Sequence, residues 1–169
     1  ITSMAIMLLI EDGKIALDDP LENYLPQLGN RRVLKAGANS LDDTEPARSS
    51  ITIRHLLNHT SGLSYGLLDH GSLMYKAYNA RKALNAFQTL AEMIDILEEL
   101  PLSFHPGEAW QYSIATDVLS RVVEVVSGRN FDQFQSLRIL NPLGMDDTGF
   151  YVPENKLHRL TAYYGGADP

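Results

Sequence analysis

Cysteine is absent from the 169 residues, and its absence excludes disulfide bonds, thiolate metal ligands and cysteine nucleophiles together. Long apolar runs are missing too, because none reaches the roughly 18 residues that a membrane-spanning helix needs. The first residues, ITSMAIMLLIEDG, lack the basic leader and the small-residue cleavage site of a signal peptide. The sequence therefore predicts no membrane partner, and it slightly favours the cytoplasm over export.

Positive charge is scarce as well. The chain has 14 Lys and Arg residues against 21 Asp and Glu residues, which gives a formal net charge of −7. Because this surplus would repel a phosphate backbone, and no long Lys/Arg run offsets it, we expect no nucleic-acid partner. Apolar residues at 44% and charged residues at 21% are ordinary for a globular protein. Residues 1–169 are accordingly interpreted as one domain.

Helical periodicity dominates the chain, and strand patterns are scarce before its last residues. Five segments carry apolar residues at helical spacing between capping signals. They start at Ile1, Thr52, Thr89, Ser113 and Asn130, and they stop before Gly13, Gly62, Pro101, Gly128 and Asn141. The first segment is apolar almost all round, which predicts a buried helix over residues 1–11. Residues 29–50 show neither apolar period and predict a surface loop, so we expect a mainly α chain.

The segment GLSYG, from Gly62 to Gly66, matches the Gly-x-Ser-x-Gly pattern of a hydrolase nucleophile elbow. That elbow is a sharp turn from a strand into a helix, and the turn exposes the serine. Ser64 instead follows a predicted helix, and Gly62 stands where that helix should stop. Since a pattern with three fixed positions recurs by chance, we expect that Ser64 is not a nucleophile.

Two other groups of residues have the spacing of a metal or acid–base site. His55 and His59 stand four apart, like the histidine ligands of zinc proteases, but Leu56 replaces the Glu that follows the first His there. Two pairs of adjacent carboxylates lie next to turn residues, where Asp favours local backbone hydrogen bonds; they are Asp18 with Asp19 and Asp146 with Asp147. We expect structural roles for all of these residues and no metal site.

Tyr112 occupies a more constrained place than these residues. It follows a Pro-Gly turn and Trp110, and it immediately precedes Ser113, the expected cap of a buried helix. Its phenol is therefore expected at a rigid helix mouth rather than on a loose loop. From position alone, packing and catalysis both stay open for Tyr112.

Four blocks of sequence carry a resemblance to a known family. They are LLIEDGKIALDDPLENYLP (8–26), ITIRHLLNHTSGL (51–63), PLSFHPGEAWQYSIATDVLSRVVEVVSGRNF (101–131) and LNPLGMDDTGF (140–150). Together they resemble the serine β-lactamase and penicillin-binding-protein-like hydrolases, closest to the class C-like branch that includes family VIII carboxylesterases. The resemblance implies an α+β fold, of which this chain is the helical portion with the sheet largely missing. It also implies a serine hydrolase that acts through an acyl-enzyme.

The resemblance implies three motifs: Ser-x-x-Lys, a tyrosine motif, and Lys-Thr-Gly or His-x-Gly on a late strand. The tyrosine motif matches Tyr112-Ser113-Ile114, which makes Tyr112 the implied general base. No serine here is followed three residues later by lysine, and His105-Pro106-Gly107 fits His-x-Gly but precedes the tyrosine. The chain is therefore expected to be an internal fragment without a nucleophile, inactive as given. No cofactor is implied.

The same resemblance bears on the substrate. Many lactamases of this branch have asparagine two residues after the tyrosine, whereas Ile114 can neither donate nor accept a hydrogen bond. An ester is therefore favoured over a β-lactam as the small-molecule substrate, while a D-amino-acid peptide and a non-catalytic helical scaffold stay open. Ser64 lies in a loop that runs near the substrate cleft in relatives, and we expect it to bind substrate together with Ile114. A fragment should also self-associate through exposed apolar surface, above all on residues 1–11.

Overall fold

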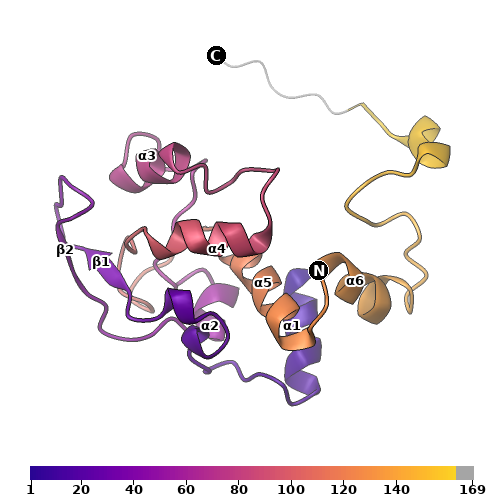
Figure 1. Cartoon of the computed structure of the whole chain (residues 1–169), viewed down its shortest axis with the longest axis horizontal. Helices are drawn as coiled ribbons and strands as arrows, with labels where there is room; N and C mark the ends of the chain where they lie inside the picture. Colours follow the sequence, from indigo (N-terminus) through magenta and orange to yellow (C-terminus); the bar gives the residue numbers. More distant parts are fainter. Residues whose placement is uncertain (163–169) are drawn as a thin grey trace.

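The computed structural model describes residues 1–162, and this part of the chain is mainly helical, as the sequence predicts (Figure 1). The α-helices are α1 (Thr2–Glu11), α2 (Ile53–Leu57), α3 (Leu73–Ala80), α4 (Leu90–Glu98), α5 (Ala115–Ser127) and α6 (Phe131–Gln135). A π-helical turn (Ser136–Leu140) continues α6, and short 3-10 turns span Leu21–Asn23, Pro26–Leu28 and Glu154–Arg159. Two strands, β1 (Arg32–Leu34) and β2 (Thr44–Pro46), form the sheet of the described residues.

Helix α5 is the centre of the core. Its apolar stripe is buried, and it packs against α1, α2, α4 and α6, which surround it in Figure 1. The buried stripe consists of Ala115, Val118, Leu119, Val122 and Val123. Full burial of one valine or leucine side chain contributes about 1.5–3 kcal/mol, so this stripe is the largest single contributor to folding that the sequence predicts. Gly128 ends the helix in the left-handed conformation, as expected.

Helix α1 has the predicted bounds but not the predicted burial. Its inner face is buried through Ala5, Ile6 and Leu9. Its outer face leaves Met4 at 49% and Met7 at 46% exposure. The expectation of a helix buried all round is therefore wrong for this part of the chain, because only one face of α1 meets α5.

The predicted helix caps are half right. Thr52 and Thr89 cap α2 and α4, each in a reciprocal capping box with the residue three positions later. Ser113 is not the N-cap of α5, which is Ile114, although its hydroxyl accepts the N–H of Ala115 at 3.4 Å. Asn130 is the N-cap of α6 by position, but its side chain makes no capping hydrogen bond.

The end of helix α2 also differs from what the sequence predicted. Helix α2 ends at Leu57, five residues before Gly62, because His59 takes the left-handed conformation with φ 58°. Leu137, on the π-helical turn that continues α6, is exposed.

Residues 29–50 contain more structure than the surface loop that was predicted. Strands β1 and β2 pair antiparallel, with Val33 opposite Glu45, and Val33 is buried. The N–H of Leu34 donates to the carbonyl of Leu102 (2.9 Å), and the N–H of Leu102 donates to the carbonyl of Arg32 (2.8 Å). A strand of three residues is too short to show an alternating pattern, which is why the sequence did not predict it.

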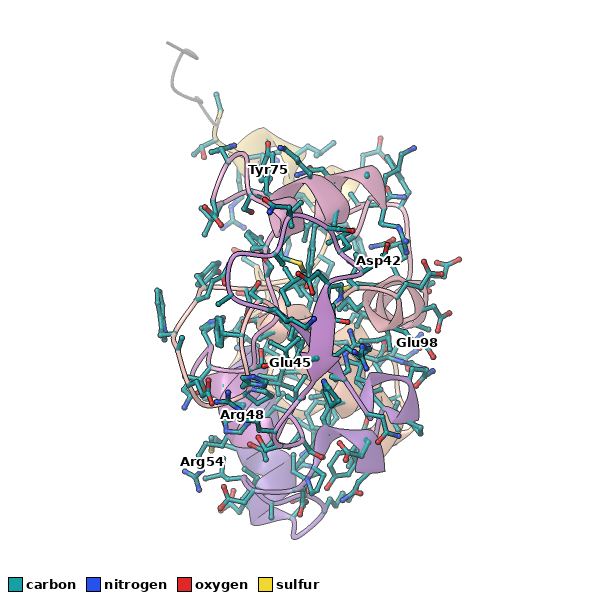
Figure 2. The ribbon with its side chains drawn as sticks, turned by 90° about the vertical axis from the view of Figure 1, so that its left-hand side faces the viewer. Asp42, Glu45, Arg48, Arg54, Tyr75 and Glu98 are labelled. Carbon is teal, nitrogen blue, oxygen red and sulfur yellow. The ribbon has the colours of Figure 1, made fainter. Side chains whose placement is uncertain are left out.

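The segment after β2 is held by His105. Its Nε2 lies 2.9 Å from Oε1 of Glu45, and its Nδ1 accepts the N–H of Arg48 at 3.4 Å. Figure 2 labels Glu45, within β2, and Arg48, just after it, on the same side of the molecule. The buried His105 imidazole therefore ties residues 45–48 to the loop that leads toward Tyr112.

Arg31 is buried and completes the C-terminal end of α4. Its guanidinium donates to the carbonyls of Leu97 (2.7 Å) and Glu98 (2.8 Å), and also to that of Leu100. The last carbonyls of a helix have no intrahelical partner, so Arg31 supplies the donors that α4 lacks. Burial lowers the pKa of Arg31 below its ordinary value, but its charge is compensated by these three oxygens.

Among the described residues, no helix is long and apolar enough to span a membrane.

We predict that Arg31→Leu lowers the free energy of unfolding by about 3 kcal/mol, because it leaves buried carbonyls at the end of α4 without donors. The matched control is Arg32→Leu at the next position, where the exposed guanidinium bonds to Thr44. That control should cost about 1 kcal/mol or less. Denaturant unfolding followed by circular dichroism measures the free energy of unfolding of both variants. Equal losses would show that the hydrogen bonds of Arg31 contribute no more to stability than those of Arg32.

We also predict that Gly62→Ala costs about 2–4 kcal/mol of unfolding free energy. Gly62 has φ +83°, and an added Cβ would overlap the carbonyl oxygen of Phe104. Gly71→Ala is the control, since Gly71 has φ +94° with open space around it and should lose only about 1 kcal/mol from backbone strain. If thermal melts show the same loss for both variants, the contact with Phe104 does not matter.

Candidate active site

Ser64 joins the GLSYG segment to two other parts of the chain. Its N–H donates to the phenol oxygen of Tyr78 on α3 (3.1 Å), and its carbonyl accepts the N–H of Ile114 (3.1 Å). Its hydroxyl accepts from Nε2 of Gln111 at 3.2 Å. Three hydrogen bonds therefore fix the turn after α2 against the segment that opens α5.

The surroundings of Ser64 differ from those of a nucleophile elbow. Its side chain is 1% exposed, and the turn follows α2 rather than a strand. A nucleophilic serine needs an accessible Oγ and a neighbouring base, whereas this hydroxyl is bonded to Gln111. Ser64 thus lies below the surface that a substrate would touch, and its expected role in substrate binding stays a prediction.

Tyr112 lies at the surface, 45% exposed, between two other rings. The His59 ring lies 4.7 Å from it, centroid to centroid, with the two planes tilted by 35°. The Tyr65 ring meets it edge-on at 5.5 Å. Trp110, also exposed, contacts the other side of His59 at 6.4 Å. The structure therefore brings Tyr112 into an aromatic cluster, defined here as His59, Tyr65, Trp110 and Tyr112.

Main-chain hydrogen bonds fix the backbone on both sides of Tyr112. The N–H of Gln111 donates to the carbonyl of His59 (3.0 Å), and the N–H of Ile114 donates to that of Ser64 (3.1 Å). The sequence predicted a phenol at the rigid start of a helix, and these two hydrogen bonds fix the backbone at that place. The chemical consequence is an accessible phenol oxygen whose Cα position is fixed, as a proton-transfer group requires.

Ile114 is buried at the start of α5. Its side chain is 0% exposed and belongs to the core under that helix, and its expected role in substrate binding stays a prediction. The physical reason is that an apolar side chain at the helix start gains more from burial than from facing water. No amide group is presented at this position.

Asp117 and Tyr65 were not singled out by sequence reasoning. Partial desolvation raises the pKa of Asp117 on the first turn of α5. Burial also raises the pKa of Tyr65, with smaller contributions from the charges of Asp117 and Tyr112. Tyr65 is therefore held protonated at neutral pH and is a poor base. An acidic residue in the first turn after the tyrosine motif was the available signal for Asp117.

The two histidines with zinc-ligand spacing do not share a helix face. Nδ1 of His55 accepts the N–H of Thr52 (3.2 Å) and so caps α2. His59 lies beyond the end of that helix, and its Nδ1 is 3.2 Å from Oγ of Ser113. Both rings are held by hydrogen bonds within the fold. In the described part of the chain, no group of three His, Asp or Glu residues is placed to hold a metal ion.

The carboxylate pairs form local bonds and ion pairs. Asp18 accepts two hydrogen bonds from Arg54 at 2.7 and 2.9 Å, which lower the pKa of that carboxyl. Asp19 accepts the N–H of Ala16 (2.6 Å) and the hydroxyl of Tyr24 (2.5 Å). Each of the two carboxylates thus has its own partner at the turn after α1.

The second pair behaves in the same way. Asp147 contacts Arg159 and Lys156, and these cations lower its pKa to about 2. The carbonyl of Asp146 accepts from Nζ of Lys156 at 2.7 Å. These contacts hold the segment after α6 and engage the carboxylate of Asp147 in ion pairs.

Two cavities in the described residues do not include Tyr112 in their walls. One of about 420 Å³ runs along α6 and residues 146–160. Another of about 550 Å³ lies between the start of α1, α5 and α6, and Asp117 is on its wall. Tyr112 lines neither cavity, so in this chain the aromatic cluster faces an open surface.

Comparison with known proteins gives a consistent result. A model of the Beta-lactamase family matches residues 1–169. Esterase EstB of Burkholderia gladioli is 35% identical over 100% of this chain and 41% of its own length. Lovastatin esterase of Penicillium rubens is 37% identical over 89% of this chain and 37% of its own. The solved structure of EstCE1, a hydrolase with promiscuous acyltransferase activity, gives a TM-score of 0.75 at 31% identity, over 92% of this chain and 38% of that one.

These matches extend along nearly the whole chain, which itself spans about 40% of the length of its curated relatives. The helices and the small two-stranded sheet are consistent with part of a β-lactamase-like fold, as the agreement with EstCE1 indicates. The family model, the relatives and the site geometry lead to one conclusion: this chain belongs to the Beta-lactamase family.

Proposed function

We propose that this chain is part of a serine hydrolase that acts through an acyl-enzyme, with Tyr112 as the general base. The observation that carries the proposal is the accessible phenol of Tyr112, fixed between the His59 and Tyr65 rings at the start of α5. A general base must offer its acceptor atom to the reacting hydroxyl in a fixed position. Tyr112 meets this condition, whereas burial raises the pKa of Tyr65 and makes its phenolate harder to form.

The proposed mechanism assigns the proton transfers to this chain. Tyr112 takes the proton from the attacking serine as that oxygen bonds to the acyl carbon, and it gives this proton to the alcohol oxygen as the ester C–O bond breaks and the alcohol leaves. The freed base then takes a proton from the water that attacks the acyl-enzyme and passes it to the serine oxygen as the acyl group is released. Free tyrosine has a pKa near 10, so the base form needs cationic neighbours. No serine of the 169 residues has lysine three residues later. The proposal therefore places the nucleophile and the cations in the longer protein, and expects the chain alone to be inactive.

The proposed substrate is a small-molecule ester rather than a β-lactam. EstB and lovastatin esterase carry esterase in their names. The Ile114 side chain, in the core, presents no amide that could pair with the amide of a β-lactam side chain. A site without that polar group loses little with a simple ester, because such a substrate has no amide to satisfy.

We predict that Tyr112→Phe in the full-length protein lowers the acylation rate of a p-nitrophenyl ester by about a hundredfold or more. Phe fills the same space, so packing against His59 and Tyr65 should survive while the proton acceptor is lost. Stopped-flow release of p-nitrophenol measures the rate, and thermal melts check the fold. Tyr151→Phe is the matched control, because Tyr151 is exposed outside the aromatic cluster and its loss should leave the rate unchanged.

Two further arms complete this experiment. The 169-residue chain alone should show no turnover above a heat-treated sample, and Ser64→Ala should not change that. Near-full activity of Tyr112→Phe would make Tyr112 a packing residue and would refute the assignment of the base.

We also propose that this chain self-associates through the outer face of α1, where a second copy covers Met4 and Met7. The double variant Met4→Gln/Met7→Gln should shift the mass measured by light scattering toward the monomer, because it removes the apolar area. Leu160→Gln, a change at an exposed leucine far along the chain, is the control and should have no effect. A monomeric wild-type chain at high concentration would contradict the proposal.

A further inference from the structure

His59 contacts the residues on both sides of Tyr112. Its carbonyl accepts the N–H of Gln111 at 3.0 Å, and its Nδ1 lies 3.2 Å from Oγ of Ser113. Between these two bonds, its ring lies against the Tyr112 ring at 4.7 Å. One residue thus makes a main-chain bond, a side-chain bond and a ring contact to three consecutive positions.

The backbone of His59 is itself in an uncommon conformation. Its φ of 58° lies in the left-handed region, which non-glycine residues other than Asn, Asp and His seldom adopt. This conformation ends α2 and turns the chain so that both the carbonyl and the ring reach residues 111–113. The turn after α2 and the start of α5 are therefore joined at His59.

We propose that His59 is a positioning residue for Tyr112: its ring and its two hydrogen bonds fix the direction of the phenol. The inference rests on the proposed function of Tyr112. Rotation about the Cα–Cβ bond swings the phenol oxygen of a tyrosine, and a misplacement of about 1 Å at a reacting group costs on the order of a hundredfold in rate. The rings of His59 and Tyr65 both lie against the Tyr112 ring, at 4.7 and 5.5 Å between centroids, and so restrict this rotation.

The charge state of His59 supports a positional role. Burial lowers the pKa of His59 below its ordinary value, so the ring is mainly neutral at pH 7. A neutral imidazole does not supply the positive charge that would stabilise a phenolate. Its contribution is therefore orientation, and a flat uncharged ring should replace it in part.

The test is a set of variants in the full-length protein, assayed for kcat and KM on a p-nitrophenyl ester. His59→Asn keeps the left-handed backbone but removes the ring, and we expect about a tenfold to thirtyfold loss of kcat with KM and the melting temperature nearly unchanged. His59→Phe restores a flat ring but neither the bond to Ser113 nor a residue that readily adopts the left-handed region, so it should recover only part of the kcat that His59→Asn loses. The control is His70→Asn, which removes a His–Tyr ring pair at 4.8 Å to Tyr75, outside the cluster, and should leave kcat unchanged.

A double-mutant cycle separates positioning from general packing. In a Tyr112→Phe background, His59→Asn should cause no further loss, because the oxygen that it positions is gone. The same fold-loss in both backgrounds, or equal losses for His59→Asn and His59→Phe, would overturn the inference. If His59→Asn does not fold, Ser113→Ala removes the bonding partner of His59 and should itself lower kcat several-fold in wild type but not in Tyr112→Phe; no loss in wild type would overturn the inference.

The two proposals fail differently. Full activity of Tyr112→Phe would refute the general-base function. A large loss in Tyr112→Phe together with unchanged kcat in His59→Asn would refute positioning by His59 alone.

Discussion

The burial of one apolar stripe on α5 is the constraint on which the rest of the structure depends. Four helices pack on this stripe, so the start of α5 cannot move without opening the core. Tyr112 lies three residues before the first residue of α5, so the packing of this helix also restricts the backbone at Tyr112. The site is thus placed by apolar packing, although none of the packed side chains can take part in chemistry.

Hydrogen bonds between distant segments fix the parts of this chain that have no regular secondary structure. The segments with chemical groups, around Ser64 and Tyr112, are neither helix nor strand, so their buried polar atoms need specific partners. Ser64 gains partners from Tyr78, Gln111 and Ile114. Arg31 does the same for the end of α4. Each of these sets of hydrogen bonds fixes two segments relative to one another, which apolar packing in the core alone would not do.

The difference between local contacts and contacts between distant segments also decides which features the sequence could predict. The capping box of Thr89 with Glu92 and the stripe of α5 are local patterns, and both were predicted correctly. Arg31 was read as part of a polar loop because its acceptors lie 66–69 residues away. Ser113 was predicted to cap α5, and its hydroxyl does accept the N–H of Ala115, but the same hydroxyl also lies 3.2 Å from Nδ1 of His59, 54 residues distant. Local sequence patterns therefore predicted the helices. The hydrogen bonds between distant segments that form the candidate site could be found only in the three-dimensional structure.

The environments of three tyrosines explain why one of them is suited to base chemistry. Tyr78 is fully buried, which raises its pKa to about 12, and its oxygen accepts from the Ser64 N–H. Tyr65 is half-buried, and burial together with the charge of Asp117 keeps its phenol protonated. Tyr112 shares a cluster with Tyr65, yet its ring reaches the surface. Desolvation disfavours phenolate, so burial works against base chemistry at Tyr65 and Tyr78, and the proposed base is the tyrosine that the fold holds in place without burying.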